Sequence, residues 1–135
     1  MNNADNKNYG FSKDERLCSR ALIDKLYSSP QRELLFPLSL HWMEVDADSD
    51  VPPVRILIVV PKRKLRHAVD RNRAKRLIRE CYRLHKHPLC DALQKQGRHI
   101  VMSLNFIHTH TPNFHKLETT MEKLIRQMVE ATDKK

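Results

Sequence analysis

The run of residues 54–60 constrains the fold more than any other segment of this chain. It reads Val-Arg-Ile-Leu-Ile-Val-Val, so nearly every residue is β-branched or aliphatic. A short apolar run of this kind is typical of a strand buried on both faces, and we therefore predict a central strand of a sheet. Pro61 follows the run and ends it.

The clearest helix is predicted over residues 71–85. Its apolar side chains follow the i, i+3, i+4, i+7, i+8 spacing of a helix that packs on a core, and they are Ala74, Leu77, Ile78, Cys81 and Tyr82. At about 100° per residue, the opposite face gathers Asn72, Arg76, Arg79, Arg83 and Lys86, with Arg71 and Lys75 beside them. We expect this helix to bury one face and to point a row of guanidinium groups outward.

The N-terminal part begins with a polar stretch, residues 1–10, which we expect to form a loose arm. A short helix should follow and end before Pro30. Two starts are possible for it, because Ser12 and Glu15 have the spacing of a capping box and Ser19 could cap a later first turn.

Further strands are predicted at residues 34–45 and 98–104, and the acidic connection 46–53 is expected to be a hairpin loop. His-Pro at residues 87–88 should break the long helix. Thr-Pro at residues 111–112 should cap a final amphipathic helix. The predicted order is helix, strands, helix, strand, helix, within one domain spanning residues 1–135.

Net charge points to the class of partner. The chain carries a formal +9, and residues 62–86 hold eleven basic side chains against only Asp70 and Glu80, whereas basic and acidic residues cancel elsewhere. A solvated helix face normally mixes both signs, so we predict a polyanion partner. We expect Glu80 to orient a neighbouring arginine.

Several other classes are disfavoured. No apolar run approaches the roughly 20 residues that span a bilayer, and the polar N-terminus lacks the apolar centre of a secretory signal, so we expect a cytoplasmic protein. Cys18, Cys81 and Cys90 are odd in number and lack a Cys-x-x-Cys pair, which favours free thiols over disulfides.

Sites built on glycine-rich loops are excluded, because the chain has only Gly10 and Gly97. No catalytic triad or carboxylate pair stands at a recognisable spacing. The best candidates for zinc ligands are Cys81, His85, His87 and Cys90. Their geometry is poor, because Cys81 lies in the apolar stripe and the chain must leave the helix at His87 before Cys90 could return. We expect no metal site in the protein, and we expect His108, His110 and His115 to be solvated.

A family signature lies in the basic segment. Residues 62–80 read Lys-Arg-Lys-Leu-Arg-His-Ala-Val-Asp-Arg-Asn-Arg-Ala-Lys-Arg-Leu-Ile-Arg-Glu. This closely resembles the signature of the protein subunit of bacterial ribonuclease P, which centres on Arg-Asn-Arg followed by Lys-Arg and Arg-Glu. The resemblance extends more loosely along the chain, through Phe11 and Arg16-Leu17 to the strands and the last helix.

The resemblance implies a ribosomal-protein domain-2-like α+β sandwich. Its sheet would be mixed but mostly antiparallel, with about four strands, three helices and a left-handed βαβ crossover, an exception to the right-handed rule. It also implies that the crossover and its helix bind a catalytic RNA subunit. The residues carried over for this contact are Lys62, Arg63, Lys64, Arg66, Arg71, Asn72, Arg73, Lys75, Arg76, Arg79 and Arg83.

A second implied surface is a cleft between the first helix and the sheet, which would bind the 5′ leader of precursor tRNA. Its expected residues are Phe11, Lys13, Ile23, Tyr27, Phe36 and His41. Two positions depart from the family pattern: Ile23 stands where an aromatic residue is common, and the turn 62–66 lacks a glycine.

The implied activity is that of a ribonucleoprotein endonuclease that releases the 5′ leader. Catalysis is expected in the RNA, with Mg²⁺ bound mainly there, and the protein would supply no catalytic residue. The alternatives are a ribosomal or other structural RNA-binding protein, a DNA-binding helix protein, and a protein-only nuclease. The oligomeric state is left open.

Overall fold

The computed structural model describes residues 13–133; the expected N-terminal arm, Phe11 and Ser12 lie outside this range. In chain order the elements are the 3₁₀ turn η1 (Lys13–Glu15), α1 (Arg20–Tyr27), β1 (Arg32–Leu35), β2 (Leu38–Val45), β3 (Val54–Val59), α2 (Ala68–His85), α3 (His87–Gln96), β4 (His99–Phe106) and α4 (Phe114–Asp133). No helix within the described range is both long and apolar enough to cross a membrane.

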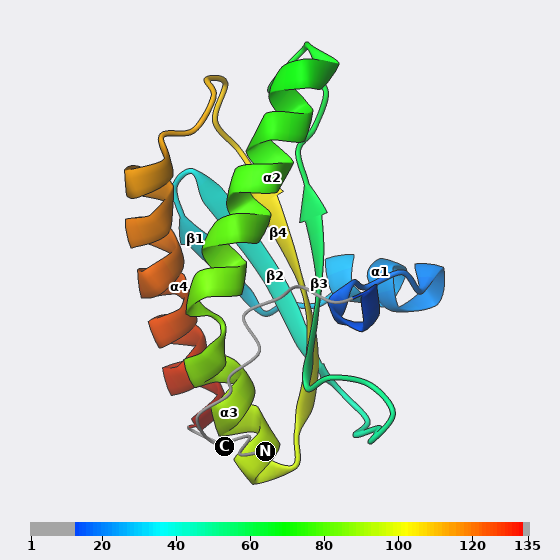
Figure 1. The fold of residues 1–135 in the computed structure, drawn as a ribbon. Coiled ribbons are helices and arrows are strands. Elements are labelled where there is room, and N and C mark those ends of the chain that lie inside the picture. The colour runs from blue at the N-terminus through cyan, green and yellow to red at the C-terminus, as the bar shows by residue number, and fades with distance from the viewer. Residues whose placement is uncertain (1–12, 134–135) are drawn as a thin grey trace.

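The four strands form one mixed sheet in the order β1-β2-β4-β3 (Figure 1). β1 pairs antiparallel with β2, β2 antiparallel with β4, and β3 parallel with β4. Met102 of β4 lies opposite Trp42 on one side and opposite Ile56 on the other. The predicted α+β fold with a mixed, mostly antiparallel sheet is confirmed.

The parallel pair β3 and β4 is joined by a left-handed crossover. In Figure 1 both strands run upward, α2 lies in front of the sheet, and β4 lies to the left of β3. This hand is rare among βαβ units. The first turns of α2, with the loop that precedes them, extend beyond one end of the sheet (Figure 1).

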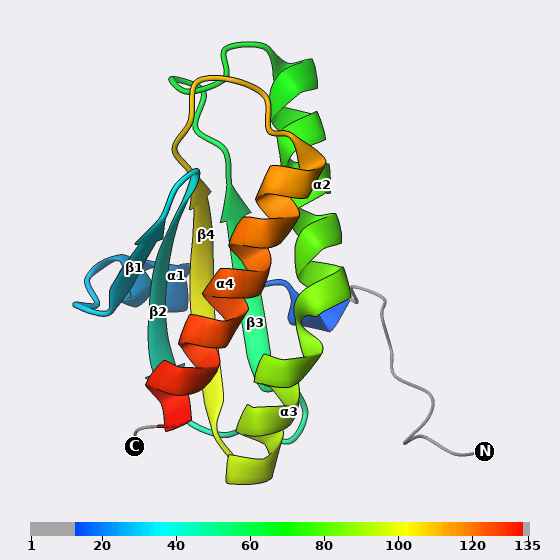
Figure 2. The same cartoon turned by 90° about the vertical axis from the view of Figure 1, so that its left-hand side faces the viewer.

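Helices cover the two faces of the sheet unequally. α2, α3 and α4 lie on one face, and α1 lies on the other (Figure 2). The larger core lies under the three helices and includes Ile78, Met102 and Leu124, whereas a smaller cluster under α1 contains Leu26 and Val101.

The prediction that residues 54–60 form a central strand is wrong. β3 is an edge strand, and β4 occupies the central position. The outer edge of β3 is instead covered by the N-terminal segment, where the Leu17 N–H donates to the Ile56 carbonyl at 2.8 Å and Arg16 bridges Ile56. This cover explains how an apolar edge strand is protected from pairing with other chains.

The predicted hairpin is misplaced. Residues 34–45 do not form one strand, because a tight turn at Phe36-Pro37 divides them into β1 and β2, which pair as the hairpin. Residues 46–53 connect β2 to β3, which are separated in the sheet by β4. The alternating apolar pattern runs through the turn, so periodicity alone did not reveal it.

The helix count also exceeds the prediction. Residues 87–88 do end α2, but they begin α3, with Pro88 in its first turn and Gly97 at its C-cap with φ of 64°. Proline is favoured at such a position because its missing N–H has no partner in a first turn anyway.

The helix caps resolve two further predictions. The described cap of α1 is Ser19, whose Oγ accepts the Leu22 N–H at 3.3 Å. Residues 111–112 do not cap the last helix; Asn113 does, accepting the Lys116 N–H through its side-chain oxygen at 3.2 Å. An asparagine side chain matches the first-turn amides better because it can reach back to them.

Candidate nucleic-acid interface

α2 separates an apolar face from a cationic face. Ala74, Ile78, Cys81 and Tyr82 are fully buried against the core. Of the basic surface that the sequence predicts, the exposed members are Lys62, Arg63, Arg66, Asn72, Arg73 and Arg76, and the partly exposed members are Lys64, Arg71, Lys75, Arg79 and Arg83. We call these eleven residues the basic surface. They lie on α2 and on the loop that enters it.

Lys86 does not belong to this surface, although its helical phase predicts an outward position. Its ammonium pairs with the carboxylate of Glu15, and the two side chains are 5% and 8% exposed. The outward row therefore ends at Arg83. That arginine donates its Nε–H to Glu80 at 3.1 Å, as expected for Glu80, and this hydrogen bond lowers the pKa of the Glu80 carboxyl.

The loop before α2 is built without glycine. The Lys64 and Leu65 N–H groups both donate to the Pro61 carbonyl, and Leu65 is buried. Arg71 reaches back from α2 and donates to the carbonyls of Leu65 at 3.0 Å and Arg66 at 2.8 Å. No non-glycine residue in the described range has a positive φ, so this loop needs no glycine. Arg71 thus organises the loop that presents the other cations.

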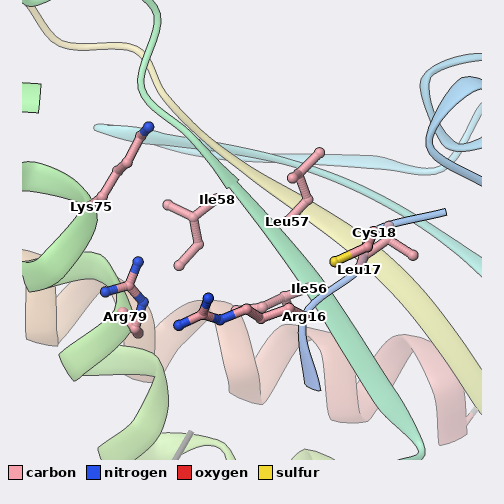
Figure 3. A pocket seen from close by; sticks show the side chains of 8 residues that line it. All are labelled: Arg16, Leu17, Cys18, Ile56, Leu57, Ile58, Lys75 and Arg79. Carbon is pink, nitrogen blue, oxygen red and sulfur yellow. The ribbon is translucent and has the colours of Figure 1, made fainter. Parts of the chain in front are cut away.

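A hollow of about 250 Å³ lies between α2 and the outer edge of β3. Three cations enter it, Lys75 and Arg79 from α2 and Arg16 from the segment after η1, and Figure 3 shows Arg16 extending toward Arg79. No carboxylate of the described range lines the hollow, and the buried Arg79 Nε has no hydrogen-bond partner there. Guanidinium groups that converge on one hollow suit a phosphate.

Arg16 is absent from the site residues that the sequence predicts. The signal available for it was the Arg16-Leu17 pair noted in the family resemblance. Its position depends on the pairing of the N-terminal segment with Ile56 of β3, which no local pattern reveals.

The second predicted surface is found in part on the α1 side of the sheet. Tyr27 and His41 are brought together, with ring centroids 5.1 Å apart. The Tyr27 hydroxyl donates to Asn105 Oδ1 at 2.8 Å and lies 2.7 Å from Ser103 Oγ. Burial and, second, the charge of Arg32 hold the pKa of His41 below its ordinary value. The Tyr27 ring and the His41 imidazole therefore lie side by side on this side of the sheet.

The remaining predicted cleft residues lie elsewhere or only beside it. Ile23 is half-buried and packs on the small cluster under α1. Lys13 is exposed in η1, beside β3. Phe36 lies at the β1–β2 turn against His108, with ring centroids 4.8 Å apart, and does not join Tyr27. Phe11 falls outside the described residues.

The candidate zinc residues and the histidines show no sign of a metal centre. Within residues 13–133, no group of three or more His, Cys, Asp or Glu side chains is placed to hold an ion. Cys81 is fully buried, and burial raises the pKa of its thiol to about 12, which opposes the thiolate form that metals bind.

Comparison with known families identifies the family to which this fold belongs. The family model of ribonuclease P matches residues 11–129. The chain belongs to the ribonuclease P protein family. The match includes η1, every strand of the sheet and the whole basic surface, and it ends within α4.

Individual relatives agree with this assignment. Ribonuclease P protein components from two strains of Porphyromonas gingivalis are 35% and 34% identical over 119 residues, covering 87% of this chain and 86% of the relatives. The component from Chlorobaculum tepidum is 53% identical over a shorter stretch of 53 residues, 37% of this chain and 34% of the relative. The solved structure of the Staphylococcus aureus RNase P protein has the same fold, with a TM-score of 0.63 at 17% identity, covering 84% of this chain and 94% of that one.

Proposed function

We propose that this ribonuclease P protein binds the catalytic RNA subunit through the basic surface on α2 and its entering loop. It binds the 5′ leader of precursor tRNA on the α1 side of the sheet, and it thereby assists removal of the leader to give the mature tRNA 5′ end. The observation that carries this proposal is the basic surface itself, eleven cationic or amide side chains on one side of α2 and on the loop before it.

Phosphate contact follows from the chemistry of these side chains. Guanidinium groups form two parallel hydrogen bonds to a phosphate, and each neutralised phosphate releases condensed counterions. Glu80 turns toward Arg83, so it does not oppose the exposed cations Arg73 and Arg76. A structured RNA, with its dense phosphates, matches such a surface better than an acidic peptide does.

The leader would use the cleft at Tyr27 and His41. Single-stranded nucleic acids bind where aromatic rings can stack on bases beside positive charge. Tyr27 is 43% exposed, while its hydroxyl is fixed by Ser103 and Asn105. The side chain is therefore held in place with part of its ring open to a base.

The cleavage chemistry is proposed to reside in the RNA subunit, with Mg²⁺ held mainly by RNA phosphates. The described part of the protein offers no ligand cluster of its own for the ion. Its contribution is to position the leader and to offset phosphate repulsion, which lets the RNA bind Mg²⁺ at lower concentration. The hollow between Arg16 and Arg79 is suited to hold one phosphate of either RNA.

A reconstitution assay tests this proposal with precursor tRNA, Mg²⁺ and the cognate catalytic RNA, with and without the full chain. We expect the protein to lower the Mg²⁺ concentration needed for leader release and to have no activity alone. A precursor that lacks the leader should bind more weakly than one that carries it, and Tyr27→Ala should not weaken its binding further.

Two outcomes would overturn the proposal. RNA binding without any change in cleavage would favour a structural RNA-binding protein. Cleavage by the protein without the RNA subunit would favour a protein-only nuclease.

A further inference from the structure

A second hollow lies away from α1, where the β1–β2 turn meets the loop before α4. Its volume is about 330 Å³, and its lining includes Phe36, Pro37, His108, Pro112, Lys116 and Leu117. We call it the Phe36 pocket. The turn is attached to the loop by the backbone, since the Ile107 N–H donates to the Pro37 carbonyl at 2.9 Å. The pocket is therefore part of the folded domain and has a size typical of small-ligand sites.

Phe36 is the most conspicuous residue of this pocket, because 61% of its surface is exposed. It is not an isolated apolar side chain. Its ring centroid lies 4.8 Å from that of His108, which lies 5.0 Å from that of His110. Three rings thus form a cluster at the rim, and Phe36 leaves much of its surface open to a further ring.

The charge around the pocket favours an anionic occupant. Lys116 is exposed on its lining, and no acidic residue of the described range lines it. Both views of the fold place this loop beyond the same end of the sheet as the loop that enters α2 (Figures 1 and 2). An RNA held on the basic surface can therefore continue toward the pocket.

We propose that the Phe36 pocket binds one unpaired nucleotide of an RNA, with its base against Phe36 and His108 and its phosphate near Lys116. This inference rests on the proposed function. It adds a stacking site separate from the pair Tyr27 and His41, because Phe36 lines a pocket with residues of α4 and neither Tyr27 nor His41 lines it. Aromatic and histidine rings beside a lysine form the combination that reads unstacked bases in single-stranded RNA.

The test uses the full chain and a short single-stranded RNA that carries 2-aminopurine, whose fluorescence falls when the base stacks. Stacking one base on an aromatic side chain is worth about 1–3 kcal/mol by alanine substitution, roughly 5- to 150-fold in affinity. We expect the wild-type chain to quench the probe. In a Tyr27→Ala background, which removes stacking at the other proposed site, Phe36→Ala should lose the remaining quenching and weaken binding within this range, and Phe36→Trp should retain both.

Leu34→Ala is the matched control. Leu34 is 69% exposed in the same hairpin but shares a sheet face with Ser39 rather than lining the pocket, so its substitution should leave the fluorescence in the Tyr27→Ala background unchanged. Lys116→Gln should weaken binding and reduce its salt dependence while the quenching persists at saturation.

The outcomes separate this inference from the proposed function. If Arg76→Ala weakens RNA binding while Phe36→Ala changes neither affinity nor fluorescence, the pocket is not a nucleotide site and the basic surface still stands. A different outcome is a dimer, seen by sedimentation, that Phe36→Ala dissociates while the probe signal stays unchanged. In that case the pocket is an interface between two copies, and the inference is overturned. If neither Arg76→Ala nor Phe36→Ala affects RNA binding, both the inference and the proposed function fail.

Discussion

The ammonium group of Lys86 is paired with the carboxylate of Glu15, and this buried pair joins the end of α2 to η1. Glu15 directly precedes Arg16, which faces Arg79 across the hollow beside β3. The pair therefore fixes the N-terminal segment relative to the helix that carries most of the basic surface.

Breaking this pair should be costly. Lys86→Met leaves the Glu15 carboxylate buried without its ammonium partner, and we expect the free energy of unfolding to fall by about 3–5 kcal/mol in urea denaturation. The double variant Lys86→Met with Glu15→Leu should recover most of that loss, because it removes both buried charges. A single variant as stable as the wild type would contradict the importance of the pair.

Arg71 should be needed for the shape of the entering loop rather than only for its charge. Arg71→Met removes the donors to the carbonyls of Leu65 and Arg66, so amides of residues 62–67 should exchange faster with deuterium. Arg73→Met removes the same charge from an exposed position and should leave that exchange unchanged. Equal exchange in both variants would show that the loop holds its conformation without Arg71.

The three thiols should react at very different rates. Cys18 is exposed at the hollow, whereas burial raises the pKa of Cys81 to about 12 and that of Cys90 to about 11. A raised pKa leaves almost no thiolate at pH 8, so a disulfide reagent should modify Cys18 quickly and the other two only after unfolding. Bound RNA should protect Cys18. Fast reaction of two thiols in the native protein would contradict the raised pKa of Cys90 or of Cys81.

His41 should titrate below the ordinary histidine range. Burial and then Arg32 lower its pKa, so the stability that this group contributes is present above the pKa of an unfolded histidine and is lost as the pH falls through the lowered value. In an NMR titration, Arg32→Gln should raise the pKa of His41 only in part, because burial remains. A wild-type His41 titrating at or above 6.5 would contradict this placement in the cleft.

The parts of the fold that depend on local pattern were predictable. The stripe through Ala74 and Ile78 indicates both the helix and its buried face, because helical periodicity is a property of neighbouring residues. The opposite outcome at Lys86 shows the limit of that reasoning. Its position in the helical repeat predicts an exposed side chain, but Lys86 is buried in a pair with the carboxylate of Glu15.

Features set by distant pairing were not predictable from the same patterns. β3 is as apolar as a central strand because Leu17 and Arg16 cover its outer edge. These two residues belong to the N-terminal segment, which is distant from β3 in the sequence. The family resemblance supplied the crossover and its hand. It did not reveal that Phe36 lies beside His108, because the turn at Phe36-Pro37 depends on the hairpin.

The salt dependence of RNA affinity tests the central claim most directly. Arg76 and Arg126 are both exposed arginines on long helices, α2 and α4, so Arg76→Ala and Arg126→Ala make the same change in net charge at different places. The logarithm of affinity for the cognate catalytic RNA should be measured against the logarithm of salt concentration for each variant. If the RNA lies on the basic surface, Arg76→Ala weakens binding and reduces the slope by about one, while Arg126→Ala matches the wild type. An unchanged slope for Arg76→Ala, or equal losses in both variants, would contradict the account.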